Sequence, residues 1–423
     1  MKKFLLILFG SIVTIVLIVV AGYFIRKQQA SKQFVSAQST AILSIAVDEL
    51  ILDNLGTLLK PSDKAVVGKE PSSSKAKNFF FNSGLAIPAR IFLFSVPQHG
   101  DQLFGILPVS NYEKCLAYFM EEHPDGLELL DKSSGTVSVK LSKHMRCLFN
   151  KEYLVYGISQ LAELEVTQLS ELISKSDSLV PVNTLKNSNP EILKAHIAYS
   201  RIDQSLNLSA QINNQKIKLD GDWQLATTMP KQTAIRKLDT TGNVLSFWSS
   251  LPLSEIPALG QFLGKYSALS KDSLAASYGG YVDLEVKAGK LMQTDTILTY
   301  DYDDNFNPIE QKEIREVEVP HIVHVWSNSK GIGQYLPDNM FYHFNKKEEN
   351  GYVLNSTTDL AAVSLTQLSA SYPLFLQVDF THWPDQWTLG PIDKLKQRQL
   401  KLSLQAEYKG GKRIQLKGVG TWK

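Results

Sequence analysis

Two histidines three residues apart are the first candidates for metal chemistry. His321 and His324 lie in Glu316–Trp326 (EVEVPHIVHVW), where apolar residues alternate as in a strand. Residues i and i+3 of a strand point to opposite faces of the sheet, so the two imidazoles diverge. A helix would bring them together, but Pro320 and the β-branched residues around it argue against a helix. We therefore expect structural histidines here and predict no metal site.

A second cluster could bind calcium through oxygen ligands. Asp301–Asn307 (DYDDNFN) places carboxylate and amide side chains at alternate positions, as calcium loops do. The segment departs from the EF-hand pattern at two diagnostic places, because Phe306 replaces the turn glycine and Lys312 the bidentate glutamate. The simpler interpretation is a hairpin loop between a strand at Thr296–Tyr302 and another at Ile309–Val319.

Sequence motifs of catalysis are missing from the chain. There is no G-x-S-x-G elbow, no Walker A loop, no H-E-x-x-H and no C-x-x-C pair. We predict no catalytic, cofactor-binding or metal-ligating residues, and an enzyme is the less favoured class. A hydrolase with a dispersed site is kept as an alternative.

Two tryptophans, Trp383 and Trp387, lie close together in WPDQW. Such a pair could form a platform on which a sugar or peptide stacks. It could equally close the end of a sheet, and the sequence leaves both interpretations open.

The chain contains two cysteines, Cys115 and Cys147. Cys115 lies on the apolar stripe of an expected helix, and Cys147 alternates with Met145 and Phe149 on an expected strand. A helix packed on that sheet could bring the sulfurs together, so a disulfide is one prediction. Two buried free thiols are the alternative.

A long apolar segment lies near the N-terminus of the chain. Phe4–Phe24 has 21 residues without a charged residue, histidine or proline, and a helix of this length spans a hydrocarbon core. We predict an uncleaved transmembrane anchor with a stalk in residues 1–35; a cleaved signal peptide is the alternative. A short basic leader usually stays inside, so we expect the body on the periplasmic side of an inner membrane.

The charge distribution excludes one class of partner. The first 35 residues carry five basic residues and no acidic ones, which leaves 39 basic and 42 acidic residues in the body. Nucleic-acid binding needs clustered basic residues on the body, so we predict no nucleic-acid partner. Membrane contact through the N-terminal helix and an envelope protein or lipid partner are expected, and the oligomeric state stays open.

The body is predicted to be two related halves. Tyr153–Ser170 aligns without gaps on Tyr352–Ser369, and seven of the 18 positions are identical. Other segments match at an offset near 200 residues, too long for a solenoid repeat. We therefore predict a duplicated domain, with one repeat at 36–230 and the other at 231–423. Each repeat is expected to be α+β, a mainly antiparallel sheet with packed helices.

Three motifs are similar to segments of uncharacterised bacterial envelope families. They are AILSIAVDEL (41–50), ILPVSNYEKCLAYF (106–119) and KIKLDGDW (216–223). The chain resembles these families, which have one N-terminal anchor or signal and a duplicated α+β body. The resemblance implies an envelope location and brings no catalytic residues.

Together these patterns favour a membrane-tethered extracytoplasmic protein that binds or scaffolds without catalysis. One alternative is a periplasmic carrier or chaperone for a lipid or lipoprotein, which needs an apolar cavity of several hundred Å³. The other is the envelope hydrolase, which needs a nucleophile, a base and an orienting group within hydrogen-bond reach.

Overall fold

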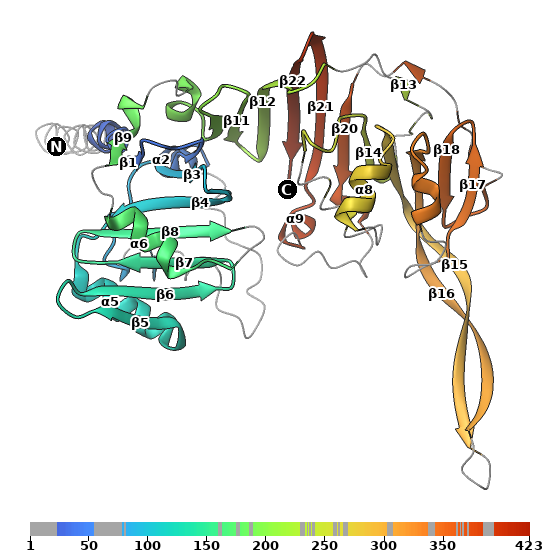
Figure 1. The fold of residues 1–423 in the computed structure, drawn as a ribbon, viewed down its shortest axis with the longest axis horizontal. Helices are drawn as coiled ribbons and strands as arrows, with labels where there is room; N and C mark the ends of the chain where they lie inside the picture. Colours follow the sequence, from blue (N-terminus) through green and yellow to red (C-terminus); the bar gives the residue numbers. More distant parts are fainter. Residues whose placement is uncertain are drawn as a thin grey trace, which may run out of the picture. The chain divides into compact units, whose positions relative to one another are not determined.

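The computed structural model divides the chain into two compact units, Met1–Gln215 and Lys216–Lys423. The structure describes residues 23–423 apart from gaps at 55–77, 80–81, 160–162, 175–177, 186–188, 229–232, 235, 237, 239–241, 257–259, 261–262, 265–269, 303–307, 337–342, 361–362, 364, 366–367, 370–371 and 384–392. Each unit contains one large antiparallel sheet (Figure 1).

The sheet of the first unit joins strands from both ends of that unit. Its strands lie in the order β11-β10-β2-β3-β4-β8-β7-β6-β5, with every neighbouring pair antiparallel. Their bounds are β2 Ala41–Ile45, β3 Ile91–Val96, β4 His99–Pro108, β5 Leu127–Asp131, β6 Thr136–Ser142, β7 Met145–Phe149, β8 Tyr153–Ser159, β10 Ile197–Arg201 and β11 Leu206–Asn213. A separate pair joins β1 (Phe34–Ser36) to β9 (Leu179–Pro181).

Short helices accompany this sheet. They are α2 (Val47–Asp53), α5 (Tyr112–Glu122), α6 (Val166–Ser174) and the 3₁₀ turns η1 (Pro124–Gly126), η3 (Val182–Thr184) and η4 (Pro190–Leu193). The Asn111 side chain caps α5 by accepting from Lys114 N at 2.9 Å. Gly84 holds the start of α5, since its carbonyl accepts from Ser110 N and Asn111 N. A Cβ on Gly84 would lie 2.4 Å from Asn111 O, and its φ is +68°, so only glycine fits.

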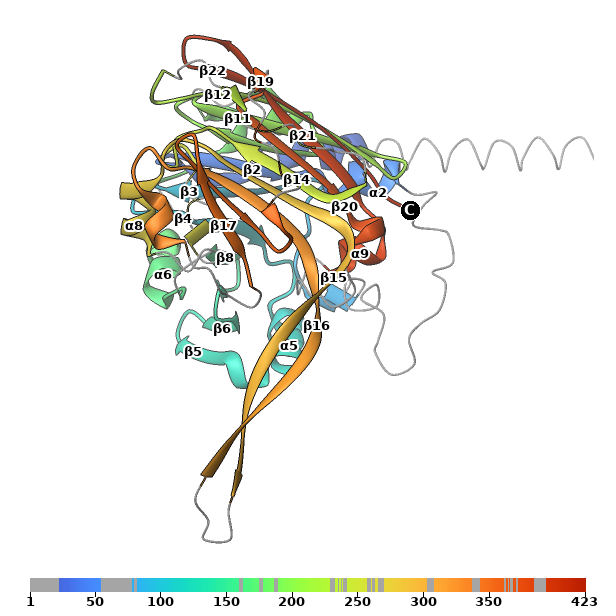
Figure 2. The same cartoon turned by 90° about the vertical axis from the view of Figure 1, so that its right-hand side faces the viewer.

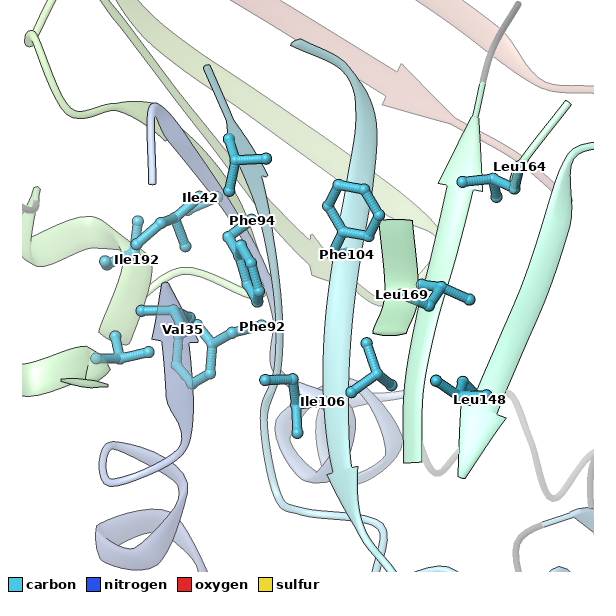
Figure 3. Close-up of a cluster of buried hydrophobic side chains, with 14 of the residues drawn as sticks. Val35, Ile42, Phe92, Phe94, Phe104, Ile106, Leu148, Leu164, Leu169 and Ile192 are labelled. Carbon is cyan, nitrogen blue, oxygen red and sulfur yellow. The ribbon is translucent and has the colours of Figure 1, made fainter. Parts of the chain in front are cut away.

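The sheet of the first unit is buried on both faces, because consecutive residues of a strand such as Cys147 and Leu148 of β7 enter two different apolar clusters. Phe94 of β3 and Phe104 of β4 are fully buried, with ring centroids 6.2 Å apart. Leu169 of α6 is buried with them, and Figure 3 shows these side chains gathered beside the strands of the sheet. A shift of one residue would exchange the side chains of the two faces, so the packing of both clusters fixes the register.

The second unit builds its sheet in the order β12-β22-β21-β20-β14-β15-β16-β18-β17, again fully antiparallel. The bounds are β12 Lys216–Gln224, β14 Asn243–Ser249, β15 Val282–Tyr302, β16 Pro308–Ser327, β17 Asn345–Glu349, β18 Tyr352–Ser356, β20 Leu374–Asp379, β21 Lys401–Gly410 and β22 Arg413–Thr421. The pair β13 (Thr233–Ala234) and β19 (Leu368–Ser369) stands apart. Short helices are α8 (Lys271–Ser277), α9 (Asp393–Gln397), η5 (Ile332–Tyr335) and η7 (Phe380–His382).

Seven strands of each unit follow one another in the same order, both along the chain and across the sheet. In the first unit these are β11-β10-β2-β3-β4-β8-β7, and in the second they are β21-β20-β14-β15-β16-β18-β17. By this order, the hairpin β3–β4 occupies the same place as the hairpin β15–β16.

The predicted fold class, α+β behind an N-terminal transmembrane helix, is wrong. More of the described residues lie in strands than in helices. The longest helix for which both ends are described, α5, has 11 residues. The apolar periodicity of residues 160–175 predicts an amphipathic helix there, whereas the described helix α6 covers only Val166–Ser174. No helix among the described residues is both long and apolar enough to span a membrane. The predicted span of residues 4–24 lies outside them except for Tyr23 and Phe24.

Candidate functional site

The longest strands of the described chain form a two-stranded ribbon. β15 and β16 have 21 and 20 residues and pair from Lys290 opposite Pro320 to Tyr302 opposite Pro308. In the described residues β14 accompanies β15 only as far as Lys287, and β18 accompanies β16 only from Val323 onward. The two strands therefore run on past the rest of their unit (Figures 1 and 2). We call Lys290–Tyr302 and Pro308–Pro320 the ribbon.

A bulge marks the root of the ribbon. The register shifts between Val286 opposite Ile322 and Lys290 opposite Pro320, so three residues of β15 face one residue of β16. Gly289 lies in the bulge with φ +93°, a conformation that other residues adopt only under strain. Bulges bend a strand and increase its twist, so this bulge redirects the ribbon where it leaves the sheet.

A side-chain clasp holds the ribbon just beyond the bulge. Gln293 donates through Nε2 to the carbonyl oxygens of His343 at 2.8 Å and Thr357 at 3.0 Å. Its Oε1 accepts from His343 N at 3.0 Å. Thr357 in turn donates through Oγ1 to Pro320 O at 2.8 Å. These bonds tie both strands to the body at the root and leave the outer part of the ribbon projecting.

The outer part of the ribbon exposes apolar and charged side chains together. Ile314 is 72% exposed, Met292 56% and Ile309 49%. Pro308–Pro320 contains four glutamates, one lysine and one arginine, whereas Leu291–Tyr300 carries a single charge, Asp295. Exposed apolar residues along an unpaired strand edge are typical of a site that pairs with another chain.

The first unit has no ribbon at the corresponding place. Its hairpin β3–β4 has strands of six and 10 residues, against 21 and 20 in β15–β16. The long hairpin is therefore a feature of the second unit. The first unit completes the same strand order with a short one.

A buried ionic network supports the root of β15. Arg236, Asp283 and Glu285 are 5%, 0% and 3% exposed. Arg236 Nη2 donates to Asp283 Oδ1 at 2.5 Å, and Arg236 Nη1 donates to Glu285. Tyr281 donates to Asp283 Oδ2 at 3.0 Å, and Asn243 Nδ2 donates to Glu285 Oε1 at 3.1 Å. Buried charges persist only when paired in this way.

The pKa shifts of this network follow from burial and from mutual attraction. Burial raises the pKa of Asp283, and the Arg236 charge works in the opposite direction. Burial lowers the pKa of the Arg236 guanidinium, but Asp283 and Glu285 raise it more, so its net shift is upward. The guanidinium thus stays charged and fixes its loop on β15. The network positions the ribbon's root and offers no nucleophile.

His324 lies on β16 next to this root. Its Nδ1 accepts from Trp326 Nε1 at 2.8 Å, so the neutral ring carries its proton on Nε2. Burial lowers the pKa of His324 to about 4, with a further contribution from the Arg236 charge. His321 lies on the same strand, as expected from the sequence, and its pKa is also lowered by burial.

We expect the His324 imidazole to titrate near pH 4 in the native chain, measured by the pH dependence of its NMR resonances. An unfolded histidine titrates near 6.5, so the unfolded state takes up the proton first as pH falls. The stability that neutral His324 contributes is therefore lost as pH falls from about 6.5 to about 4. His324→Gln should make the denaturation midpoint less dependent on pH in this window. A native titration near 6.5 would contradict the burial of the ring.

The first unit contains a histidine–carboxylate pair that resembles part of a catalytic triad. His196 Nε2 lies 3.0 Å from Asp53 Oδ2, and His196 Nδ1 accepts from Ile212 N at 2.9 Å. Both ring nitrogens are thus engaged, and neither can take a proton from a nucleophile. Asn54 adds a bond from Nδ2 to Ile212 O at 3.0 Å. The pair connects the end of α2 to β11.

A small pocket of about 150 Å³ lies beside α2. Four of its nine lining residues are charged: Lys27, Asp48, Glu49 and Arg90. Arg90 donates to Ala195 O at 2.7 Å, Ile192 O at 3.0 Å and Glu49 Oε2 at 3.2 Å. Burial lowers its pKa, against the attraction of Glu49. At about 150 Å³ the pocket is too small for a lipid chain or a typical organic ligand.

The predicted cysteine sites meet in one core. Cys115 and Cys147 are both free and buried in the cluster that contains Phe119 and Phe149. Burial raises the pKa of Cys115 to about 12 and raises that of Cys147 as well. The two thiols are thus protonated and enclosed, and a disulfide between them stays a prediction for an oxidising compartment.

We expect both thiols to resist an aromatic disulfide reagent in the folded chain. The thiolate is the reacting form, and burial suppresses both its formation and its access. In denaturant the two thiols should react at the rate of free cysteine, at least 100-fold faster by absorbance. Fast reaction of either thiol in the native state would contradict this packing.

The predicted tryptophan platform is only half described. Trp383 is half-buried and packs on Phe380, with ring centroids 5.1 Å apart and planes 35° apart. Trp387 lies outside the described residues. The contact with Phe380 shows Trp383 packing at the end of β20, and the binding role stays a prediction.

Sequence reasoning missed both the length of the ribbon and the network at its root. The hairpin was predicted at Thr296–Tyr302 and Ile309–Val319, which is only its outer part; the loop residues 303–307 lie outside the described residues. Arg236 lies 47 residues from Asp283, so no local pattern links them. One local sign of a buried ionic site was available in the sequence: Asp283 and Glu285 alternate with the apolar residues Val282, Leu284 and Val286.

Comparisons with known proteins identify no family. No protein-family model matches the sequence, and no curated protein matches it. Three crystal forms of TP0453 have a similar structure. Crystal form IV is 7% identical over 44% of this chain and 77% of that chain, with a TM-score of 0.27. Form III is 8% identical over 77% and 93% (TM-score 0.26), and form I is 9% identical over 75% and 88% (TM-score 0.23). At these TM-scores the likeness supports no conclusion about fold or function.

Proposed function

We propose that this protein is a non-catalytic binding or scaffolding protein whose working surface is the ribbon. The observation that carries the proposal is a pair of long strands with outer edges that no described strand covers. Strand edges bind partners through backbone hydrogen bonds, and neighbouring side chains select them.

The energetics of strands support a binding role. An isolated two-stranded hairpin is marginally stable in water, and a long exposed edge favours unwanted association. The chain nevertheless anchors the ribbon with the Gln293 clasp and the Arg236 network. A partner strand added to the edge would satisfy the open backbone groups and cover Ile314.

The two alternatives have weaker support in the described residues. A carrier needs a continuous apolar cavity. The pocket beside α2 measures only about 150 Å³, and an open pocket of about 510 Å³ in the second unit is lined mainly by the polar residues His343, Asn345, Lys346 and Glu348. A hydrolase needs a base with a free nitrogen or oxygen, whereas the His196–Asp53 pair has both imidazole nitrogens engaged.

The place of action belongs to the same proposal. The apolar segment 4–24 would attach the body to a membrane, with the body on the extracytoplasmic side. To test this, Lys132, which is exposed, is changed to Cys in a chain with Cys115 and Cys147 replaced by Ala. Labelling by a membrane-impermeant thiol reagent without lysis is the expected result. Protection until lysis would place the body inside the cytoplasm.

We also propose that the two units arose by duplication. The shared strand order of seven strands and the match of Tyr153–Ser170 to Tyr352–Ser369 support this. Under this proposal the ribbon is a later elongation of the hairpin that β3–β4 retains at its original length.

A photo-crosslinking experiment tests the binding proposal. A photoreactive amino acid is placed at Ile314 or Thr294 on the ribbon, and at Leu129 as an exposed control in the first unit. After irradiation in cells, the ribbon positions should give discrete crosslinked products that the control lacks. A second chain, in which Asn-Gly replaces residues 291–319, joins the paired residues Lys290 and Pro320 by a two-residue turn. It should stay folded and lose any activity of the protein in cells. The same products at Leu129 would overturn the proposal.

A further inference from the structure

Of the two edges of the ribbon, the outer edge of β16 carries the charge pattern that can select a partner. No described strand pairs with it between Ile309 and Val319. Its charges alternate in sign around one residue, Ile314, which is the most exposed large apolar side chain of the described chain. The facing strand carries only Asp295 in Leu291–Tyr300, so its edge has no charge pattern to select a partner.

The sequence around Ile314 is complementary to itself when reversed. Glu313 and Arg315 flank Ile314, and Lys312 and Glu316 lie one residue further out. In an antiparallel pair of two copies related by a two-fold axis at Ile314, residues equally distant from Ile314 face each other. Glu313 of one copy then faces Arg315 of the other, and Lys312 faces Glu316. Opposite charges directly across two strands stabilise the pair.

The pairing ends where β16 enters the body of the unit. Val319 is 2% exposed and Pro320 O already accepts from Thr357 of the same chain, so the ladder stops at Glu318. Glu310 would face Glu318, but Glu318 already forms an ion pair with Lys290 of its own ribbon. The complementary part is therefore Lys312–Glu316, since beyond it Gln311 would face Val317 and Glu310 would face Glu318.

Neighbouring registers are unfavourable. A two-fold axis perpendicular to the paired strands must pass through a residue that faces its own copy. Moving the axis by one residue places Glu313 opposite Glu313, or Arg315 opposite Arg315. Like charges directly opposite destabilise a strand pair. Ile314 is therefore the favoured centre, where the two apolar side chains cover each other.

We propose that two copies of this chain pair antiparallel through the outer edges of β16, with Ile314 at the two-fold axis. The pairing joins the two ribbons into a four-stranded sheet. The closed two-fold geometry makes the interface isologous, so it ends at a dimer. This inference rests on the proposed function, since it names the partner at the ribbon.

A cysteine experiment on the full chain in mild detergent tests the centre of symmetry. Directly opposed residues of antiparallel strands have Cα atoms about 4.5–5.5 Å apart, within reach of a disulfide. Ile314→Cys should therefore form a covalent dimer under a mild oxidant. Lys312→Cys and Glu316→Cys lie away from the axis and should crosslink at least 10-fold more slowly. Cys115 and Cys147 are buried, so the rate at which the unsubstituted chain forms covalent dimers gives the background. Equal rates for the three variants would overturn the register.

Charge reversal supplies the matched control. Glu313→Arg alone and Arg315→Glu alone each place like charges opposite each other, so each variant should be monomeric by sedimentation velocity. An equimolar mixture of the two variants restores opposite charges on both sides of the axis and should form a heterodimer. Arg315 also pairs with Asp295 of its own ribbon at 3.8 Å, so the internal rescue adds Asp295→Arg; the variant E313R/R315E/D295R should dimerise like the original chain. Failure of both rescues would overturn the pairing.

The two proposals fail in different ways. If the copies do not pair but the ribbon still crosslinks to a different protein, the second copy is the wrong partner and the binding surface is correct. If neither the copies nor any other protein crosslinks at the ribbon, the proposed function fails as well.

Discussion

Arg236→Ala is expected to destabilise the second unit by about 3–5 kcal/mol, the usual effect of removing one partner from a buried ion pair. The substitution leaves Asp283 and Glu285, 0% and 3% exposed, without their cation. Burial already raises the pKa of Asp283 with Arg236 present, so the loss of Arg236 would raise it further. Urea denaturation followed by tryptophan fluorescence measures the effect, since Trp326 and Trp248 lie in this unit.

A matched control separates this effect from the loss of any arginine. Arg413 forms an ion pair with Asp222 on the exposed face of β12 and β22. Arg413→Ala should leave the denaturation midpoint unchanged, because exposed pairs contribute little. Adding Asp283→Asn and Glu285→Gln to Arg236→Ala removes the orphaned charges and should recover part of the loss. Equal effects of Arg236→Ala and Arg413→Ala would contradict the role of the network.

Phe149→Ala is expected to destabilise the first unit by about 3–5 kcal/mol, the range for a fully buried phenylalanine. Phe149 is 0% exposed and stacks on Phe119, with ring centroids 5.5 Å apart. Its removal opens a cavity beside Cys115 and Cys147, which share the cluster. Both thiols should then react faster with an aromatic disulfide reagent, which provides a second readout of the same cavity.

An exposed leucine of the same unit is the control for this substitution. Leu129 on β5 is 48% exposed, and Leu129→Ala should change the free energy of unfolding by no more than about 0.5 kcal/mol. If Phe149→Ala were as mild as Leu129→Ala, the aromatic cluster would not be the core of this unit.

The strands of the first unit were accessible to sequence reasoning, whereas the overall class was not. Apolar patterning predicts strands at Thr136–Leu141, Met145–Asn150 and Tyr153–Ile158, and β6, β7 and β8 agree with them to within about one residue. The helical patterns were read as longer elements than they are, as at Val166–Ser174. Periodicity identifies a helix but does not show how little of the chain it occupies, so the predicted α+β class was wrong.

The ribbon was predicted too short at its root. Glycine and proline are both unfavourable inside a strand, so Gly289 and Pro320 give no sign that the two strands continue past this point. In the structure they lie together at the root, where the bulge absorbs the extra residues and Pro320 sits opposite Lys290. The site at the root was beyond sequence reasoning for another reason. Arg236 meets Asp283 only after the chain has folded, and no pattern joins residues so far apart.

Hydrogen–deuterium exchange of the full chain most directly tests whether the ribbon is the working surface. Exchange is compared between the chain in its native membrane preparation and the purified chain diluted in detergent. We expect peptides covering Pro308–Pro320 to be protected in the native preparation, because a paired edge holds its amides in hydrogen bonds. Peptides from β5 and β6 in the first unit should exchange equally in both samples. Identical exchange of the ribbon in both samples, with protection elsewhere, would contradict the claim.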